Sequence, residues 1–405
     1  MDNTCTPPTI ERVRVSLLTG GMDPPYVLGL LSGLIGHPVL IDVIGNDEMK
    51  DEAVMQNQQI LYFNFRGNQD EHSTINKKIS RIVRYYIQLM WYAFRTDSKV
   101  FHILWFNRFI HFDRTILNLY YKLLGKTLIY TAHNINAGER DGTDTFLNRL
   151  SLRWLYGIVD HIIVHTDKMK DQLIREFDVA EQRVTVMVFG INNTSPRSQM
   201  TRQGARGVLG IGIQEQVLLF FGNIAPYKGL DILVKALATL KKNGQAPKLL
   251  IAGKIKDSKS LLHWADIERT IEEHNLHQHI IKTIAFIPDQ DVELYYKAAD
   301  VLILPYRHIF QSGVLFLGYS FGLPVIATDV GSLKNDIVEG HTGFVCRPED
   351  VDHLANTIRR YFRSDLYTNL NMGREDISRY ANDKYSWQQG GDTTYAIYRR
   401  LLQVK

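Results

Sequence analysis

The chain contains little cysteine and no long apolar run. Its 405 residues include two cysteines, Cys5 and Cys346, which lie far apart and outside any Cys-x-x-Cys or Cys/His cluster. This argues against a disulfide framework or a structural zinc site and is typical of a reducing cytosol. No run of about 18 apolar residues occurs, so we expect no membrane-spanning helix. Residues 2–8 are polar and rich in proline, unlike a secretory signal, and we expect a cytoplasmic protein.

Several catalytic motifs are also absent. There is no Gly-x-Ser-x-Gly elbow and no His-Glu-x-x-His motif. Gly210 and Gly212 begin a dinucleotide-like pattern, but they precede their strand and no third glycine follows, which disfavours an NAD-type oxidoreductase. Asp289 and Asp291 resemble a carboxylate pair for a metal. They follow Pro288 and open a helical segment, so we predict that Asp289 caps this helix and Asp291 lies in its first turn.

The composition is that of an ordinary globular protein. Hydrophobic residues make up 45% and charged residues 22%, and the formal net charge is only +4. We therefore expect no binding of nucleic acid through bulk charge. The length exceeds that of one ordinary hydrophobic core and predicts two α/β domains. The basic excess is local, with ten Lys and Arg against two acidic residues, Asp97 and Asp113, between residues 76 and 126.

Apolar segments alternate with helical segments along both halves of the chain. The alternation predicts a parallel sheet covered by helices on both faces. It restarts after residue 195, and the polar residues 195–207 read as a linker. We predict two doubly wound domains with a cleft between them, over residues 1–197 and 205–387. The expected strands are residues 13–18, 39–44, 59–64, 100–105, 127–131 and 161–165, then 217–221, 248–252, 280–284, 301–304 and 325–327.

Three loops of the second half follow expected strands. They are residues 222–229, 253–257 and 306–313. Since ligands of open α/β sheets bind at the carboxyl ends of the strands, we expect these loops to lie together. Lys228, in a glycine-flanked loop that opens a helix, is suited to contact a phosphate. The alternative for Lys228 is an ordinary solvated loop lysine.

The third of these loops ends in Gln-Ser-Gly-Val at residues 311–314. A helical segment is expected over 313–321, so Ser312 and Gly313 stand where it begins. Unpaired backbone amides and the helix dipole attract anions at such a point, and glycine allows close approach to the backbone. The pattern predicts a cradle for a phosphate or a diphosphate.

The basic region contains an amphipathic helical segment. Its cations include Lys77, Lys78, Arg81, Arg84 and Arg95. We favour the interpretation that its apolar stripe packs on the core. The alternative is that the segment, residues 76–95, lies on an anionic membrane surface and serves a lipid-linked acceptor. The stripe consists of Ile79, Ile82, Val83, Tyr86, Ile87, Met90 and Phe94.

Most of residues 127–400 resemble family-4 retaining glycosyltransferases of the GT-B fold. In the first half the resemblance rests on residues 130–134 (Tyr-Thr-Ala-His-Asn) and on 184–193. In the second half it rests on residues 221–229, 287–301, 304–306, 312–314 and 322–344.

The resemblance implies a GT-B fold of two Rossmann-like domains, an acceptor-side domain over 1–197 and a nucleotide-sugar donor domain over 205–387. It also implies that the final helix, residues 388–405, packs back on the first domain. The implied reaction moves a sugar, with retention, from a nucleotide diphosphate sugar to a hydroxyl of a glycan, a glycolipid or a small molecule. A hexosyltransferase of this kind needs no covalent protein nucleophile, metal ion or other cofactor. Peripheral contact with the cytoplasmic membrane face would suit a lipid-linked acceptor.

The resemblance also assigns residues. It implies catalytic roles for His133, facing the donor sugar, and for Lys228, at the leaving diphosphate. The alternatives are a structural strand-end histidine for His133 and a simple tight turn for Gly20 and Gly21. The implied donor-binding residues are Gly20, Gly21, Asn223, Lys228, Lys254, Arg307, Gln311, Ser312, Gly313, Val314 and Leu315.

The chain departs from the usual family pattern at three positions. Asn223 stands where most members have Arg, and Ile309 and Leu317 stand where most have two Glu. The Gln-Ser-Gly-Val form resembles a subset of polysaccharide-type members. Two functions fit this pattern: an active retaining glycosyltransferase, or a weak or inactive relative that acts as a nucleotide-sugar binding or partner subunit. A sugar-nucleotide epimerase on the same fold is a third alternative.

Overall fold

The computed structural model describes residues 12–69, 74–140, 144–191, 193, 197–244 and 246–403, without the side chains of residues 139 and 140. The chain divides into two compact units. Unit 1 comprises Met1–Gly190 and Trp387–Lys405, and unit 2 comprises Ile191–Ser386. The division after Gly190 comes earlier than the predicted boundary at residue 197. Cys5 and residues 195 and 196 of the predicted linker lie outside the described residues.

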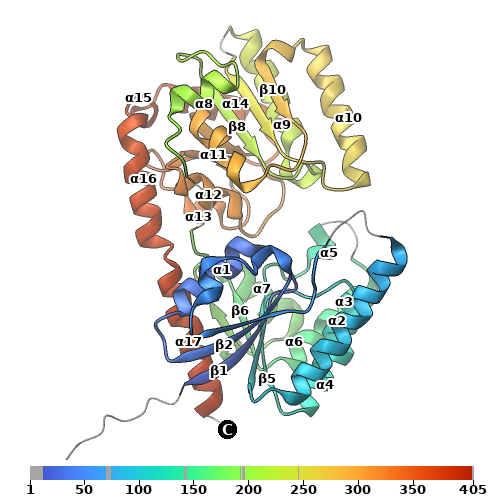
Figure 1. Cartoon of the computed structure of the whole chain (residues 1–405). Helices are drawn as coiled ribbons and strands as arrows, with labels where there is room; N and C mark the ends of the chain where they lie inside the picture. Colours follow the sequence, from blue (N-terminus) through green and yellow to red (C-terminus); the bar gives the residue numbers. More distant parts are fainter. Residues whose placement is uncertain are drawn as a thin grey trace, which may run out of the picture. The chain divides into compact units, whose positions relative to one another are not determined.

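Unit 1 is built on a parallel sheet with the strand order β3-β2-β1-β4-β5-β6-β7 among the described residues (Figure 1). The sequence predicted the first six strands to within two residues at each end and did not predict β7. The strands are β1 Val13–Leu18, β2 Val39–Gly45, β3 Ile60–Asn64, β4 Val100–Ile103, β5 Thr127–Thr131, β6 His161–Val164 and β7 Val184–Val186.

Helices cover both faces of this sheet. Successive side chains of a strand point to opposite faces of the sheet, so the contacts of β1 show which helices lie on each face. Val15 and Leu17 pack in the core that contains α1 and α17. The Ser16 hydroxyl, on the other face, shares a hydrogen bond of 2.8 Å with Tyr92 of α2. The helices are α1 Pro24–Leu34, α2 Ile75–Arg95, α3 Ile110–Phe112, α4 Asn118–Leu123, α5 Ala137–Arg140, α6 Phe146–Ile158, α7 Asp167–Phe177 and α17 Trp387–Gln403.

The last helix, α17, packs closely on α1 within unit 1. A Cβ at Gly33 would lie 2.0 Å from the Trp387 carbonyl oxygen, and a Cβ at Gly391 would lie 2.0 Å from the Gly33 carbonyl oxygen. Glycine at these positions therefore permits backbone contact between the two helices. Farther along α17, the buried Tyr398 hydroxyl lies 2.6 Å from Nδ1 of His102 on β4.

The preferred interpretation of the apolar stripe on α2 was wrong. The core side of α2 consists of Tyr85, Leu89, Tyr92 and Ala93. Tyr92 directs its hydroxyl inward and donates to Asp42 at 2.5 Å, so the buried side is aromatic with polar ends. Of the stripe, Ile82 and Tyr86 are half-buried. The rest faces solvent: Ile79, Val83, Ile87, Met90 and Phe94.

Unit 2 contains a second parallel sheet, with the order β10-β9-β8-β11-β12-β13 among the described residues (Figure 1). The sequence predicted the first five strands and did not predict β13. The strands are β8 Val217–Phe221, β9 Lys248–Ala252, β10 Ile280–Thr283, β11 Val301–Leu304, β12 Val325–Thr328 and β13 Gly343–Cys346. The helices are α8 Arg202–Val208, α9 Leu230–Lys242, α10 Ser258–Glu273, α11 Asp289–Ala298, α12 Gly313–Ser320, α13 Leu333–Asp336, α14 Val351–Phe362, α15 Asp365–Thr368 and α16 Leu370–Lys384.

Part of the predicted linker is helix α8 of unit 2. Arg206 of α8 is fully buried. Its guanidinium group donates to Asp300 Oδ2 at 2.9 Å and to the Ala298 carbonyl oxygen at 3.0 Å. The polar sequence suggested a loop because a buried arginine is rare, and here the carboxylate and the carbonyl compensate its charge and its donors. The predicted fold class is confirmed: each unit is a doubly wound, Rossmann-like domain.

Candidate functional site

Each sheet has one point at which the strand order reverses. In unit 2 the reversal lies between β8 and β11, and in unit 1 it lies between β1 and β4. Loops that leave neighbouring strands in opposite directions open a crevice at this point, where ligands of such sheets bind. Most of the predicted site residues follow these strands or their neighbours.

The three predicted loops of unit 2 do lie together. The Ile224 amide donates to the Lys254 carbonyl oxygen at 2.8 Å and joins the loops after β8 and β9. The Arg307 amide donates to the Tyr227 carbonyl oxygen at 2.8 Å and joins the loops after β8 and β11. The loops also touch at a glycine: a Cβ at Gly229 would lie 1.9 Å from the Pro305 carbonyl oxygen.

Lys228 is turned into this loop cluster. It ends a short 3-10 helix, Pro226–Lys228, and is only 8% exposed. Its Nζ lies 5.4 Å from the centre of the Tyr306 ring and would lie 3.0 Å from a Cβ on Gly222. The same Cβ would lie 3.6 Å from Cγ2 of Val314. The Lys228 ammonium group and the start of α12 therefore meet over Gly222, directly after β8.

The start of α12 presents backbone donors on the same side. Ser312 precedes the helix, is 5% exposed and does not use its hydroxyl to cap it. The Leu315 amide bonds back to the Ser312 carbonyl oxygen at 3.0 Å, whereas Gly313 and Val314 carry the first amides that have no acceptor within the helix. Oε1 of Gln311 is buried without a hydrogen-bond partner among the described residues.

The remaining candidate residues of unit 2 differ in their exposure and in their contacts with other side chains. Arg307 forms a bidentate pair with Asp231, at 2.8 and 2.6 Å, and this pairing raises the pKa of its guanidinium group. Its charge is thus already compensated by a carboxylate. Asn223 and Lys254 are exposed, and Lys254 Nζ lies 5.8 Å from the centre of the Phe286 ring. Leu315 is fully buried, which limits it to a backbone or packing role.

The sequence predicts that Asp289 caps α11, and this prediction is wrong. Pro288 occupies the capping position, and Asp289 and Asp291 both lie in the first turn of the helix. Negative side chains there stabilise the helix through its dipole. Within the described part of the chain, no group of three or more His, Cys, Asp and Glu side chains is arranged to hold a metal ion.

In unit 1, Gly20 and Gly21 follow β1 in left-handed conformations, with φ of 61° and 66°. A Cβ at Gly20 would lie 2.8 Å from Cβ of Trp105, and one at Gly21 would lie 2.9 Å from Nε of Arg66. The Arg66 guanidinium group also donates to the Gly20 carbonyl oxygen. The two glycines therefore form a tight turn that is fixed between Trp105 and Arg66.

His133 follows β5 at the same edge of the sheet. Its ring stacks on Trp105 with a centroid distance of 4.0 Å and an angle of 3°. Tyr26 and His165 also contact it, at centroid distances of 4.6 and 5.2 Å. Burial, and then the neighbouring histidines, hold the pKa of His133 well below 6.5, so its imidazole is neutral at pH 7. Nε2 of His133 has no hydrogen-bond partner among the described residues.

Trp105, Tyr26 and His165 also belong to this cluster and were not predicted from the sequence. Burial lowers the pKa of His165 to about 4, and its Nε2 also lacks a partner among the described residues. A signal was available, because Trp105 and His165 closely follow β4 and β6, as His133 follows β5. Strand-end position therefore identifies three of the four aromatic residues of this cluster.

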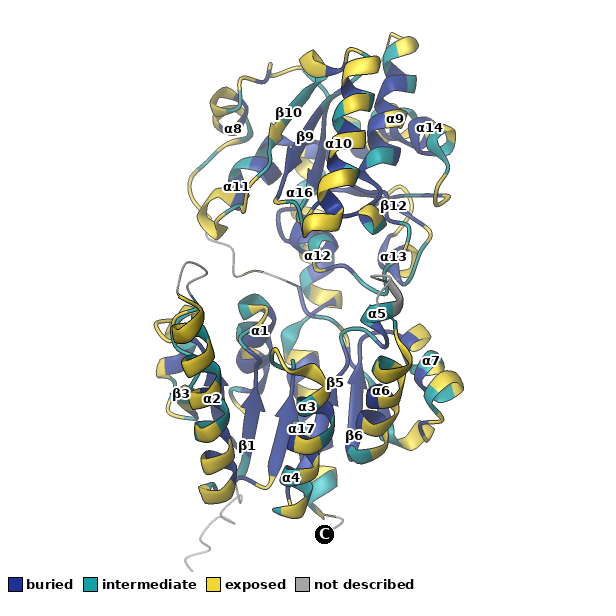
Figure 2. Cartoon of the chain, turned by 90° about the vertical axis from the view of Figure 1, so that its right-hand side faces the viewer, coloured by how far each residue is buried: buried dark blue, intermediate teal, exposed yellow. Residues whose placement is uncertain are grey.

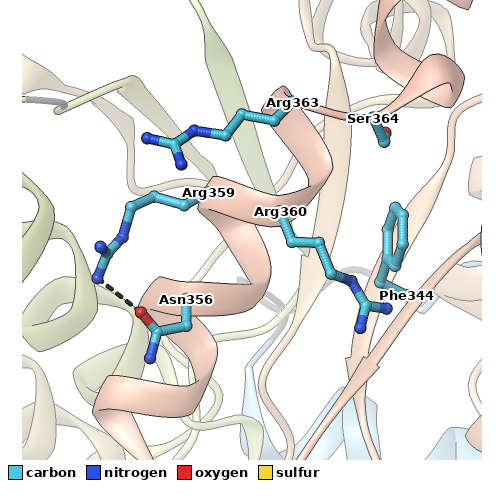
Figure 3. Close-up of a pocket in the computed structure, with 6 residues that line it drawn as sticks. All are labelled: Phe344, Asn356, Arg359, Arg360, Arg363 and Ser364. Atoms are coloured by element: carbon cyan, nitrogen blue, oxygen red, sulfur yellow. Dashed lines mark hydrogen bonds between the residues drawn. The ribbon is translucent and has the colours of Figure 1, made fainter.

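A pocket of about 450 Å³ lies elsewhere in unit 2, against the last turn of α14 (Figure 3). It is lined by Arg359, Arg360 and Arg363, together with Asn356, Phe344 and Ser364. Arg360 is paired with Glu339 and Arg359 donates to Asn356. None of the predicted site residues lines this pocket.

Both halves of the chain match known protein families. Residues 66–194 match the model described as glycosyltransferase family 4, and residues 215–364 match the model described as glycosyl transferases group 1.

Among curated proteins, the chain is similar to several named D-inositol 3-phosphate glycosyltransferase. The protein from Saccharomonospora viridis is 27% identical over 69% of this chain and 65% of its own length. The protein from Corynebacterium diphtheriae is 23% identical over 67% of this chain and 64% of its own length. The chain thus spans slightly less than two thirds of these relatives.

Solved structures share the fold over almost the whole chain. Sucrose-phosphate synthase from Thermosynechococcus elongatus superposes with a TM-score of 0.74 at 17% identity, covering 97% of this chain and 100% of that chain. HepE from Anabaena, solved in complex with UDP and glucose, gives a TM-score of 0.71 at 16% identity, covering 95% and 99%.

These findings define the class of the protein as a two-domain chain with the GT-B fold of glycosyltransferases. More particularly, its first half matches the family model described as glycosyltransferase family 4, and its second half matches the one described as glycosyl transferases group 1.

Proposed function

We propose that this chain transfers a sugar from a nucleotide diphosphate sugar to an acceptor hydroxyl. The observation that carries the proposal is that the Lys228 ammonium group and the side chain of Val314, at the start of α12, lie beside the same glycine, Gly222, at the strand-order reversal of unit 2. Support comes from solved relatives of the same fold: HepE structures contain UDP or UDP-glucose, and a starch synthase IV structure contains ADP.

The proposed site acts on the leaving group. When the bond between the anomeric carbon and the diphosphate oxygen breaks, negative charge develops on the diphosphate. Lys228, the Gly313 and Val314 amides and the dipole of α12 would stabilise that charge. Lys228 Nζ and Val314 Cγ2 lie 3.0 and 3.6 Å from the point where a Cβ on Gly222 would stand, so the missing side chain leaves room for the ammonium group beside the start of α12.

The proposal also includes retention of the configuration at the anomeric carbon and the identity of the transferred sugar. The acceptor oxygen would bond to the anomeric carbon on the face from which the diphosphate leaves, and its proton would pass to a diphosphate oxygen. No covalent protein nucleophile takes part in this scheme, and the charge on the diphosphate is met by protein groups without a divalent metal. We assign the residues 311–314 loop to the Gln-Ser-Gly-Val form of the family, with a hexose as the transferred sugar.

In unit 1 we propose that His133 binds a sugar hydroxyl. Its Nε2 is shielded and without a partner among the described residues, and a neutral imidazole can donate or accept one hydrogen bond there. Stacking on Trp105 and the contact with Tyr26 fix the plane of the ring. The Gly20–Gly21 turn at the same sheet edge makes room for Trp105 and Arg66, and so helps to position the ring on which His133 stacks.

A panel of UDP-, GDP- and ADP-sugars tests the proposal. Release of nucleoside diphosphate is measured in the presence of an acceptor extract, and the anomeric configuration of the product is read by NMR. Turnover with one donor, unchanged by EDTA and with retained configuration, is expected. Binding of a donor without any turnover would favour the partner-subunit alternative, and absence of both binding and turnover would refute the proposed site.

A further inference from the structure

One face of unit 1 carries most of the large exposed apolar side chains of the described residues. On α2 these side chains recur at helical spacing along the whole helix, so they form one continuous stripe. We call the set the apolar face. It consists of Ile75, Ile79, Val83, Ile87, Met90, Trp91 and Phe94 on α2, Phe109, Ile110, Ile116, Leu119 and Leu123 over α3 to α4, and Phe146, Leu147, Leu150 and Trp154 on α6.

The three segments form one layer. The Tyr120 hydroxyl of α4 donates to the Met90 carbonyl oxygen of α2 at 3.0 Å. Arg114, between α3 and α4, donates to Asn148 and Ser151 of α6 at 2.8 and 3.1 Å. Figure 2 shows α2, α3, α4 and α6 side by side over the sheet, with their exposed sides turned toward the viewer. The apolar face is therefore continuous across neighbouring helices.

The exposed charged residues within the helices of this layer are basic. Neither α2 nor α6 contains an acidic residue. The one acidic residue between α3 and α4, Asp113, is buried and accepts a hydrogen bond from Tyr86 at 2.7 Å. The exposed cations of these helices are Lys77, Arg84, Arg95 and Arg153, together with Arg149, which is paired with Asp144 just before α6. By helical spacing, the three cations of α2 lie along one border of its apolar stripe.

We propose that the apolar face binds peripherally to an anionic lipid bilayer, with its apolar side chains entering the interface and the bordering cations meeting lipid phosphates. Contiguous apolar patches on ordinary soluble domains stay small, so a layer with this many exposed apolar side chains is suited to bind a partner surface. Amphipathic helices with aromatic and aliphatic residues beside Lys and Arg bind such interfaces. A second copy of the chain is a poorer occupant, because it would oppose cations with cations.

No helix among the described residues is long and apolar enough to cross a membrane. The proposed binding is therefore through the surface of the folded unit. It concerns the location of the protein and the supply of a membrane-held acceptor. It is measured without turnover, so it stands or fails separately from the proposed transfer reaction.

Vesicle co-sedimentation tests the proposal. The full chain is mixed with vesicles of phosphatidylcholine alone or of phosphatidylcholine with phosphatidylglycerol, at low and at high salt. Binding to the anionic vesicles is expected, with weaker binding in high salt. The double variant Ile79→Ser/Ile87→Ser and the double variant Phe146→Ser/Leu150→Ser should each lower the partition coefficient by at least about tenfold, since each removes two large apolar side chains from the interface.

A matched control is available in unit 2. Leu262 and Phe286 are as exposed as the residues of the apolar face, at 76% and 68%, and lie outside it. The variant Leu262→Ser/Phe286→Ser should bind vesicles like the wild type. Neutralising Lys77 and Arg84 together should weaken binding by about tenfold or more at low salt and less at high salt.

Three outcomes would overturn the proposal. The first is no binding of the wild type to anionic vesicles. The second is binding that the α2 and α6 variants leave unchanged while they keep the wild-type melting temperature. The third is a dimer in solution that the same variants convert to a monomer without any vesicle binding, which would assign the face to self-association.

Discussion

Replacing Lys228 by alanine removes the only side-chain cation that the structure turns toward the start of α12 among the predicted donor residues it describes. Arg307 is held by Asp231, and the exposed Lys254 lies beside Phe286. Asn223 offers no charge. The variant therefore leaves the leaving diphosphate with backbone amides and the helix dipole alone.

The magnitude follows from the burial of Lys228. At 8% exposure its charge is little screened by water, so its effect on developing charge is near the upper end of the range for such groups. Loss of one preorganised donor costs about 2.7–4 kcal/mol, or about 10²–10³ in kcat. Binding of the nucleoside diphosphate itself should weaken less, by about 10–100-fold, as expected for a lost charged hydrogen bond.

The assay compares kcat and KM for the donor with the Kd of the nucleoside diphosphate. A larger loss in kcat/KM than in binding shows that Lys228 acts on the transition state. Lys235→Ala, an exposed lysine of α9, is the matched control and should match the wild type. Turnover of Lys228→Ala within about threefold of the wild type would refute the assignment.

Three further outcomes are expected. Gly391→Ala should destabilise unit 1 by about 1–3 kcal/mol or more, because its Cβ would lie 2.0 Å from the Gly33 backbone. The control Gly390→Ala should be neutral or stabilising by up to about 1 kcal/mol. Urea unfolding measures the free energy of unfolding of both variants. Burial lowers the pKa of His102 to about 3, so its native imidazole stays neutral while the unfolded chain takes up a proton near pH 6.5. Stability should therefore fall as pH drops from 6.5 toward 3, and His102→Asn should reduce the slope by up to about 1.4 kcal/mol per pH unit. Ser312→Ala should lower nucleotide affinity several-fold in calorimetry while costing less than about 0.5 kcal/mol of stability, because the hydroxyl does not cap α12.

Each of these has a clear contrary result. Equal stability of the Gly391 and Gly390 variants would contradict the close approach of α1 and α17. An unchanged pH slope in the His102 variant would mean that this imidazole is not held neutral. A large loss of stability in the Ser312 variant, with unchanged affinity, would assign its hydroxyl to the fold.

Eleven of the described strands were predictable because each is a short, mostly apolar run with a loop directly after it, whereas β7 and β13 were not predicted. The sites of Lys228, Ser312 and His133 follow from the order of these strands alone, since parallel strands bring their carboxyl ends to one edge. What the sequence pattern could not reveal were pairings between distant residues. Arg307 was a donor candidate until Asp231 was found beside it, 76 positions away in the chain.

The orientation of α2 failed for a related reason. Its more apolar side was assigned to the core because burial usually follows hydrophobicity. The structure buries the side with Tyr85 and Tyr92 instead, where the Tyr92 hydroxyl finds Ser16 and Asp42 on neighbouring strands. Hydrogen bonds to partners far along the chain decided the orientation, and helical periodicity carries no information about them.

The most direct test of the central claim is a crystal structure of the chain with whichever of UDP, GDP or ADP binds most tightly. Our account predicts that the diphosphate oxygens lie within hydrogen-bond distance of the Gly313 and Val314 amides and of Lys228 Nζ, above Gly222. A diphosphate bound instead in the arginine-lined pocket beside α14, with the α12 start vacant, would contradict it.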